Sequence, residues 1–146
     1  MRMKRSGRTS IIVLVALALV AAVVVLFLLA GDSPSAAANR FLMALAKGDT
    51  KTLAENSYME GLQGPEMEKR WQDTYDVTKY WVFAYKVLET EEQNGDNATV
   101  RLDWVKNAAS DAAYPEKYEL PMIKQEGKWK VDVRGISREM YPALPR

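Results

Sequence analysis

The sequence contains no cysteine and no histidine among its 146 residues. The lack of cysteine excludes disulfides, thiolate metal ligands and a lipid attached to a cysteine side chain. The lack of histidine removes the commonest metal ligand and the commonest general base near neutral pH. The chain also lacks a Gly-rich phosphate loop and a carboxylate cluster with metal-ligand spacing. These absences predict no metal site and no cofactor.

Basic residues are scarce outside the first eight positions, which hold four of the 20 Lys and Arg residues: Arg2, Lys4, Arg5 and Arg8. All 19 Asp and Glu residues follow residue 31, where they face the remaining 16 cations. The larger part of the chain is therefore mildly acidic. It shows no basic stripe of the kind that nucleic-acid phosphates require, so no nucleic-acid partner is expected.

Residues 11–30, IIVLVALALVAAVVVLFLLA, contain no charged residue, no proline and no glycine. Twenty helical residues span about 30 Å, which is the thickness of the hydrocarbon core of a bilayer. A helix buried in a protein core normally keeps a polar face, and this run has none. The sequence therefore predicts a transmembrane helix over 11–30.

A cleaved signal peptide is the alternative to a retained anchor. The apolar region of a signal peptide is usually ~7–15 residues long and ends in small residues one and three positions before the cleavage site. The run is longer than that, and Leu28 is too large for its place two residues before Ala30. A small-residue triplet at 36–38 lies inside a predicted helix. We therefore predict an uncleaved signal-anchor.

The charge distribution predicts the orientation of this single-pass segment. Four cationic residues precede the run, whereas residues 31–45 contain one cationic residue, Arg40. The positive-inside rule then makes residues 1–10 a cytoplasmic basic tail and places the rest of the chain outside the cytoplasmic membrane of a bacterial-type cell. A linker of three residues, 31–33, keeps the following domain at the surface of the lipid bilayer.

Helix signals dominate residues 33–78. Ser33 is a good N-cap, Pro34 fits the first helical position and Gly48 suits the residue after a helix, which together predict a helix over 34–47. Asp49 or Thr50 can cap a second helix over 50–57. A third helix is predicted over 65–78, with apolar residues at helical spacing.

From residue 80 the apolar period changes from 3.6 to 2, which predicts four strands. Asn94 and Gly95 are suited to positive φ in the turn between the first two strands. Pro121 is expected at a sheet edge or a bulge, because it cannot donate a ladder hydrogen bond. Residues 135–146 are predicted as a C-terminal tail. The order of elements gives an α+β class, with three helices packed on an antiparallel four-stranded sheet.

The chain resembles the nuclear transport factor 2-like superfamily through SPSAAANRFLMALAKGDTKTL at 33–53 and GKWKVDV at 127–133. In this superfamily a helix ending in Lys-Gly-Asp is followed at once by a second helix, and a Gly-x-Trp-x-Val strand closes the sheet. The resemblance covers residues 34–134. It implies a cone-shaped fold whose curved sheet wraps over a long helix. With the anchor, the chain resembles membrane-anchored bacterial members.

Seven aromatic residues are predicted to point into the cone, where they either fill a core or line a ligand pocket: Trp71, Tyr75, Phe83, Tyr85, Trp104, Tyr118 and Trp129. Aromatic stripes at strand and helix spacing are typical of any core, so a core is the first interpretation. A pocket for a small apolar ligand is the alternative.

No catalytic residue is predicted. Enzymes of the resembled superfamily place a carboxylate inside the cone, and such a group needs a pKa tuned by an apolar pocket. Asp103, Glu119 and Asp132 fall on the polar face of their strands, out of phase with the aromatic residues. Glu89 is in phase, but it lies at an acidic strand end and is expected in solvent. The chain is therefore predicted not to be an enzyme.

The predicted function is that of a non-catalytic interaction or assembly module at the membrane. It would be an accessory or scaffold subunit of a membrane-associated complex, with protein partners or a second copy of itself. The sheet edge near Pro121 and the tail 135–146 are candidate docking elements. A small apolar-ligand binding domain is the alternative, and an enzyme of the same fold is a third possibility.

Overall fold

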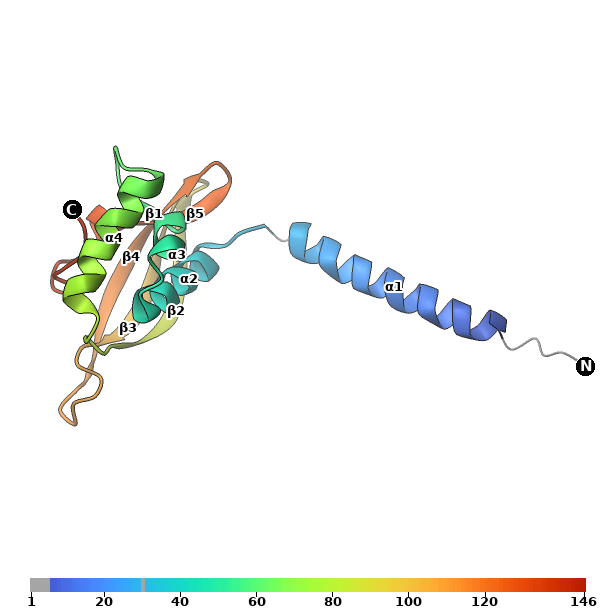
Figure 1. Ribbon diagram of the computed structural model, residues 1–146, viewed down its shortest axis with the longest axis horizontal. Helices are drawn as coiled ribbons and strands as arrows, with labels where there is room; N and C mark the ends of the chain where they lie inside the picture. Colours follow the sequence, from blue (N-terminus) through green and yellow to red (C-terminus); the bar gives the residue numbers. More distant parts are fainter. Residues whose placement is uncertain (1–5, 30) are drawn as a thin grey trace, which may run out of the picture. The chain divides into compact units, whose positions relative to one another are not determined.

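The structure is a computed structural model that describes residues 6–29 and 31–146, with side chains for 11–23 and 31–146. The chain divides into two compact units, Met1–Gly31 and Asp32–Arg146. Each is described by itself, and Figure 1 shows the elements of both. The side chains of the whole expected basic tail, 1–10, and of 24–30 at the end of the expected membrane segment lie outside the described ones.

The first unit contains one helix, α1 (Ser6–Leu29). Its described side chains are exposed over 11–23, and Leu14 and Leu17 are 65% and 62% exposed. Among the residues that the structure describes, no helix is both long enough and apolar enough to cross a membrane.

The helices of the second unit confirm the local signals in the sequence. α2 (Pro34–Lys47) begins after Ser33, whose hydroxyl accepts the Ala36 N–H at 3.2 Å, and it ends at Gly48, whose φ is 69°. α3 (Thr50–Glu55) is capped by the Asp49 carboxylate, and α4 (Gly64–Thr78) has Pro65 in its first turn. Side-chain capping and a left-handed glycine thus define the start and the end of α2.

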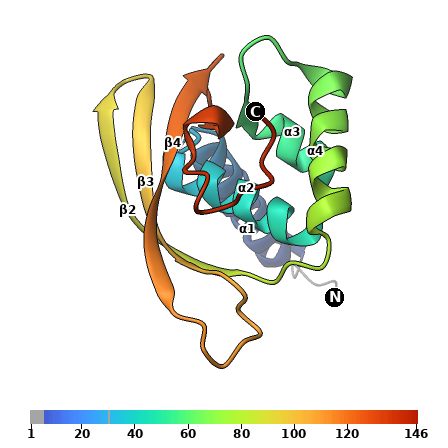
Figure 2. The ribbon, with the colours of Figure 1, turned by 90° about the vertical axis from the view of Figure 1, so that its left-hand side faces the viewer.

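The sheet has five strands in the order β1-β5-β4-β3-β2. They are β1 (Ser57–Tyr58), β2 (Ala84–Asn94), β3 (Asn97–Val105), β4 (Pro115–Gln125) and β5 (Lys128–Asp132). β1 pairs parallel with β5, and the other pairs are antiparallel. The long strands curve strongly, and the helices cover one face (Figure 2). The α+β class is confirmed, but the sheet is five-stranded and mixed rather than four-stranded and antiparallel.

Strand β1 arises where the second predicted helix was expected to continue. That helix ends at Glu55 instead of residue 57. The Asn56 carbonyl accepts the Val131 N–H at 2.8 Å, and the Ser57 hydroxyl donates to the Leu53 carbonyl. The chain therefore leaves the helix to join the end of β5, a long-range pairing that local propensity does not encode.

The turn between β2 and β3 differs from the expected one. Neither Asn94 nor Gly95 has positive φ. The Asn94 side-chain oxygen instead accepts the backbone N–H groups of Asp96 and Asn97, both at 3.0 Å. A side chain that bonds to the backbone two residues ahead stabilises a turn without left-handed backbone.

The core lies between the sheet and the helices. The alternation predicted for β3 is confirmed, because Ala98, Val100, Leu102 and Trp104 are all at most 2% exposed. From α2 and α4, Phe41 and Trp71 are fully buried, and their rings meet edge to face at 5.6 Å between centroids. The short helix α3 adds Leu53 to this core. One continuous core thus joins the helices to the sheet.

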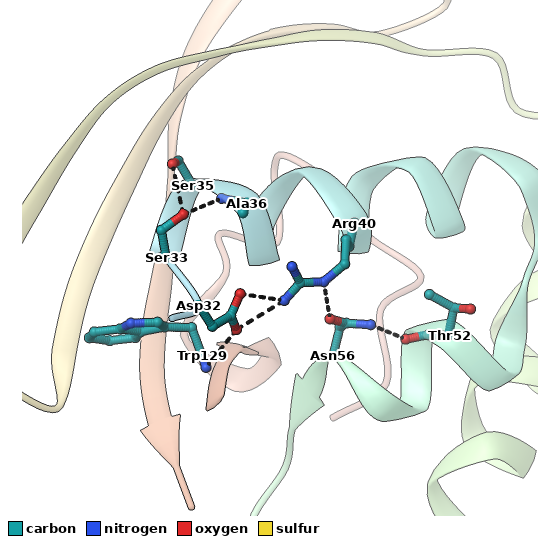
Figure 3. Close-up of polar contacts among 8 residues, drawn as sticks. All are labelled: Asp32, Ser33, Ser35, Ala36, Arg40, Thr52, Asn56 and Trp129. Atoms are coloured by element: carbon teal, nitrogen blue, oxygen red, sulfur yellow. Dashed lines mark hydrogen bonds and ion pairs between the residues drawn. The ribbon is translucent and has the colours of Figure 1, made fainter. Parts of the chain in front are cut away.

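Asp32, expected in a linker, is bonded into the domain (Figure 3). Its carboxylate accepts two hydrogen bonds from Arg40 Nη2, at 2.9 and 3.0 Å, and one from the Trp129 N–H at 3.1 Å. Arg40 Nε also donates to the Asn56 side chain at 3.0 Å. Charge-assisted bonds of this kind are among the stronger ones in proteins, so the ordered domain begins at Asp32.

Residues 135–146 are part of the domain and not a free tail. Ile136, Met140, Tyr141 and Leu144 are at most 5% exposed. The Thr74 hydroxyl of α4 donates to the Ala143 carbonyl at 3.0 Å. In Figure 2 the C-terminal segment crosses between the sheet and α4. Four side chains that were expected to be available for docking are therefore unavailable to a partner.

Pro121 lies where one side of β4 has no strand partner, as its sequence position predicts. It pairs with Thr99 of β3, and the pairing of β4 with β5 starts one residue later, at Met122. Beside it the chain turns at Gly135, where a Cβ would lie 2.6 Å from Pro121 Cγ. The missing donor of Pro121 is tolerated because the pairing with β5 does not reach it, and the turn at Gly135 packs against its ring.

Candidate functional site

The interior of the domain is filled by several of the predicted pocket residues. Trp71, Trp104 and Trp129 are at most 4% exposed. Trp71 and Tyr75 border only a space too small for a water molecule. Close packing of this kind is normal for a protein core, so Trp71, Tyr75 and Trp129 pack the domain.

Tyr85 and Trp129 each have a local partner. The Tyr85 hydroxyl donates to the Asn39 side chain on α2 at 3.2 Å, and burial raises the pKa of Tyr85. The Lys124 ammonium group lies 5.6 Å from the centroid of the Trp129 ring. Both residues therefore tie elements of the domain together.

A pocket of about 230 Å³ lies where β2 begins and β3 ends. We call it the aromatic pocket, and it is lined by Trp81, Val82, Phe83, Trp104, Lys106, Asn107, Glu139, Met140, Tyr141 and Pro142. Of the seven predicted residues, only Phe83 and Trp104 take part. The other walls come from residues before β2 and from the C-terminal segment.

Four rings pack against one another in the aromatic pocket. Phe83 stacks on Trp104 with centroids 4.4 Å apart and planes 22° apart. The Tyr141 ring meets both of them at steep angles, 86° and 80°. It also meets Trp81 at 62°, with centroids 5.3 Å apart. The lining is therefore aromatic on several sides.

A polar triad, defined as Lys106, Glu116 and Tyr118, adjoins the pocket through Lys106. Lys106 Nζ donates to the Tyr118 hydroxyl at 3.2 Å, and that hydroxyl donates to Glu116 Oε2 at 2.9 Å. Lys106 also forms an ion pair with Glu116 at 3.7 Å. Two of the predicted aromatic residues thus differ in role. Tyr118 belongs to a polar network, whereas Trp129 packs in the core.

The polar triad is not suited to act as a general base at neutral pH. The Tyr118 hydrogen bond raises the pKa of Lys106, and the nearby carboxylates of Glu116 and Glu139 add to the effect. Burial raises the pKa of Tyr118, with Glu116 adding to it and Lys106 opposing it. A raised pKa keeps Lys106 as an ammonium ion and Tyr118 as a neutral phenol at neutral pH. The triad can therefore bind and orient groups.

Sequence reasoning missed Lys106, Glu116, Glu139 and Tyr141. A signal existed for two of them, because Glu116 continues the period-2 face of Tyr118 and Leu120, and Lys106 continues that of Trp104. The period-2 rule identifies the face of a strand but not the point where that face reaches solvent. Glu139 and Tyr141 lie outside any strand, and only the apolar content of their segment hints at burial.

Two buried indole N–H groups lack a partner among the described residues, those of Trp71 and Trp104. Leaving a buried donor unpaired costs about 1–3 kcal/mol. Trp104 is also a wall of the aromatic pocket.

The remaining charged groups are on the outer face or at helix ends. Arg101 lies 3.4–3.7 Å from Glu89, Glu91 and Glu119, all of them exposed, so the predicted solvated position of Glu89 is confirmed. Hydrogen bonds from the Thr52 hydroxyl and amide lower the pKa of Asp49, as expected of an N-cap. Over the described part of the chain no group of three acidic residues could hold a metal ion.

Comparison with solved structures supports the fold. A ketosteroid isomerase-like protein from Erwinia carotovora is 20% identical over 67% of this chain and 87% of its own, with a TM-score of 0.47. A SEC-C motif containing protein from Rhodopseudomonas palustris is 18% identical over 68% and 75%, with a TM-score of 0.51. An NTF-2 like protein from Shewanella oneidensis is 10% identical over 65% and 88%, with a TM-score of 0.47.

The likeness to the Rhodopseudomonas palustris protein, with its TM-score of 0.51, covers about two thirds of this chain. At such identities the likeness concerns the fold alone, because one fold hosts many functions. No protein-family model matches the sequence, and no curated protein matches it. Function must therefore be argued from the residues of this chain.

Proposed function

We propose that the chain is a single-pass, membrane-anchored binding module, non-catalytic, whose domain works outside the cytoplasmic membrane as a subunit of a membrane-associated complex. The observation that carries the proposal is the run of 20 uncharged residues at 11–30, preceded by four cations. An anchor confines its domain near membrane partners and so raises their effective concentration.

The domain offers an exposed apolar segment for such a partner. Val77, Tyr80, Trp81 and Val82 are 65%, 84%, 44% and 53% exposed. Contiguous exposed apolar residues favour a protein interface, in which tyrosine and tryptophan are enriched. We call residues 77–82 the exposed aromatic segment. A protein interface at this segment would explain why these apolar side chains are exposed to solvent.

The exposed aromatic segment lies far from the residue that begins the domain. Asp32 bonds to Trp129, which pairs with Lys124, and the Lys124 N–H bonds to Asp96 in the β2–β3 turn. The segment precedes Ala84 at the opposite end of β2, an 11-residue strand about 35 Å long. The exposed aromatic segment and Asp32 therefore lie towards opposite ends of β2.

The proposed topology predicts a labelling pattern in intact cells. The chain has no cysteine, so a single introduced one is the only target for a maleimide that does not cross membranes. Ala109→Cys, in an exposed loop of the domain, is expected to react in intact cells. Ser6→Cys, in the basic tail, is expected to react only after permeabilisation. The reverse pattern, or protection of both positions, would refute an outside domain.

The assembly role predicts a site-specific crosslink. A photoreactive phenylalanine derivative in place of Tyr80 is expected to give a light-dependent adduct of defined mass in cells. The same group in place of Glu92, exposed at the far end of β2, is the matched control and is expected to give none. An adduct of about twice the 16.5 kDa chain would indicate a homodimer. Equal adducts at both positions, or none at either, would contradict the proposal.

The aromatic pocket favours a second candidate function, the binding of a small ligand. Most of the seven aromatic residues pack in the core or in local contacts, but an aromatic pocket of about 230 Å³ opens where β2 begins. Pockets lined by aromatic residues with a few polar groups are the usual form of ligand sites.

A further inference from the structure

We propose that the aromatic pocket binds a small organic cation, an ammonium group with alkyl substituents. This inference rests on the second candidate function and names the class of its ligand. Three features of the pocket carry it: its four aromatic rings, its charge and its size.

The rings supply the attraction. Trp81, Phe83, Trp104 and Tyr141 all border the pocket, and Tyr141 stands at 62–86° to the other three. Rings that differ in orientation can present both faces and edges to one bound group. A cation over such faces gains about 0.5–2 kcal/mol, and recognition of alkylated ammonium groups is a common use of aromatic clusters.

The charge around the pocket favours a cation over an anion. Lys106 is paired with Glu116 at 3.7 Å and hydrogen-bonded to Tyr118. Glu139, a pocket residue, has no ion-pair partner within the described part of the chain. One ammonium group against two carboxylates leaves a net charge of −1. An anionic ligand would be repelled by Glu139, because the neighbouring Lys106 already pairs with Glu116, whereas a cation would be attracted to it.

The size restricts the ligand to a small molecule or a headgroup. A volume of about 230 Å³ is below the roughly 300–1,000 Å³ of sites for drug-sized ligands. An alkylated ammonium group with a short polar substituent fits this limit.

Calorimetry with the full chain in a neutral maltoside detergent tests the proposal. The probes are tetramethylammonium, choline and 3,3-dimethyl-1-butanol, which has the shape of choline without its charge. Choline is expected to bind at least about tenfold more tightly than the alcohol, a difference of about 1.4 kcal/mol. Quenching of tryptophan fluorescence provides a second readout, because Trp81 and Trp104 line the pocket.

Two variants assign the binding to the pocket. Glu139→Gln is expected to weaken choline binding about three- to tenfold and to leave the affinity for 3,3-dimethyl-1-butanol unchanged. Trp81→Leu, at a position that is 44% exposed, is expected to weaken it further without unfolding the domain. Glu92→Gln is the matched control, since it removes an exposed carboxylate at the other end of β2.

The outcomes separate the two proposals. If the alcohol binds as tightly as choline, or if Glu139→Gln does not change choline binding, the proposed class of ligand is wrong. The ligand-binding function of the pocket would still stand. If none of the probes binds, both the cation and the ligand-binding function fail. Competition by vesicles of phosphatidylcholine, but not of phosphatidylglycerol, would identify a lipid headgroup as the source of the same cation.

Discussion

Deletion of residues 136–146 is expected to unfold the second unit. The deletion removes four apolar side chains that are at most 5% exposed: Ile136, Met140, Tyr141 and Leu144. Each buried side chain of this kind contributes about 1.5–3 kcal/mol. Their combined loss is comparable with the roughly 5–15 kcal/mol that stabilises a typical domain. Circular dichroism and limited proteolysis in detergent, with the full chain as reference, are expected to show loss of the folded domain in the truncated chain.

If the truncated chain aggregates, a point substitution in the same segment tests the prediction instead. Tyr141→Ala is expected to lower the free energy of unfolding by about 3–5 kcal/mol, since it removes a ring packed on three others. Arg138→Ala, at an exposed position of the same segment, is the control and is expected to change it little. A truncated chain that melts like the intact one would show that 136–146 is the dispensable tail expected from sequence.

Local signals in the sequence predicted the helices well. Ser33 and Gly48 mark the bounds of α2 because each acts on its nearest neighbours, through a capping bond and a left-handed backbone. The same holds for the inward face of β3, which a period of two identifies. β1 escaped prediction because Ser57 and Tyr58 are extended only through pairing with Val131 and Asp132, more than 70 residues away.

The candidate site was predicted only in part for the same reason. Phe83 and Trp104 lie on predicted strand faces, and both border the aromatic pocket. The pocket is completed by Glu139 and Tyr141, which return to the end of the sheet from the C-terminus. No periodic pattern in a short segment rich in proline and turns can indicate this return. Long-range packing therefore decides whether an aromatic stripe fills a core or borders a pocket.

Gly48→Ala is expected to destabilise the domain by about 2–5 kcal/mol. Gly48 has a φ of 69°, a left-handed conformation that costs a residue with a side chain about 1–2 kcal/mol. A Cβ at this position would also overlap the ring of Tyr75 on α4. Overpacking of this kind typically costs about 1–3 kcal/mol. Denaturant unfolding monitored by circular dichroism measures the sum.

Two further variants separate the backbone cost from the clash. Gly61 has a φ of 80°, and a Cβ there would meet no other atom within 4 Å, so Gly61→Ala is expected to show the backbone cost alone. In a Tyr75→Ala background the ring that overlaps the added Cβ is absent. Gly48→Ala should then lower the free energy of unfolding no more than Gly61→Ala does. The resulting coupling energy is expected at about 1–3 kcal/mol, as for residues in direct contact. Equal losses for Gly48→Ala and Gly61→Ala in the unaltered chain would mean that the ring moves freely. The close approach of α4 to the end of α2 would then not be what requires glycine at position 48.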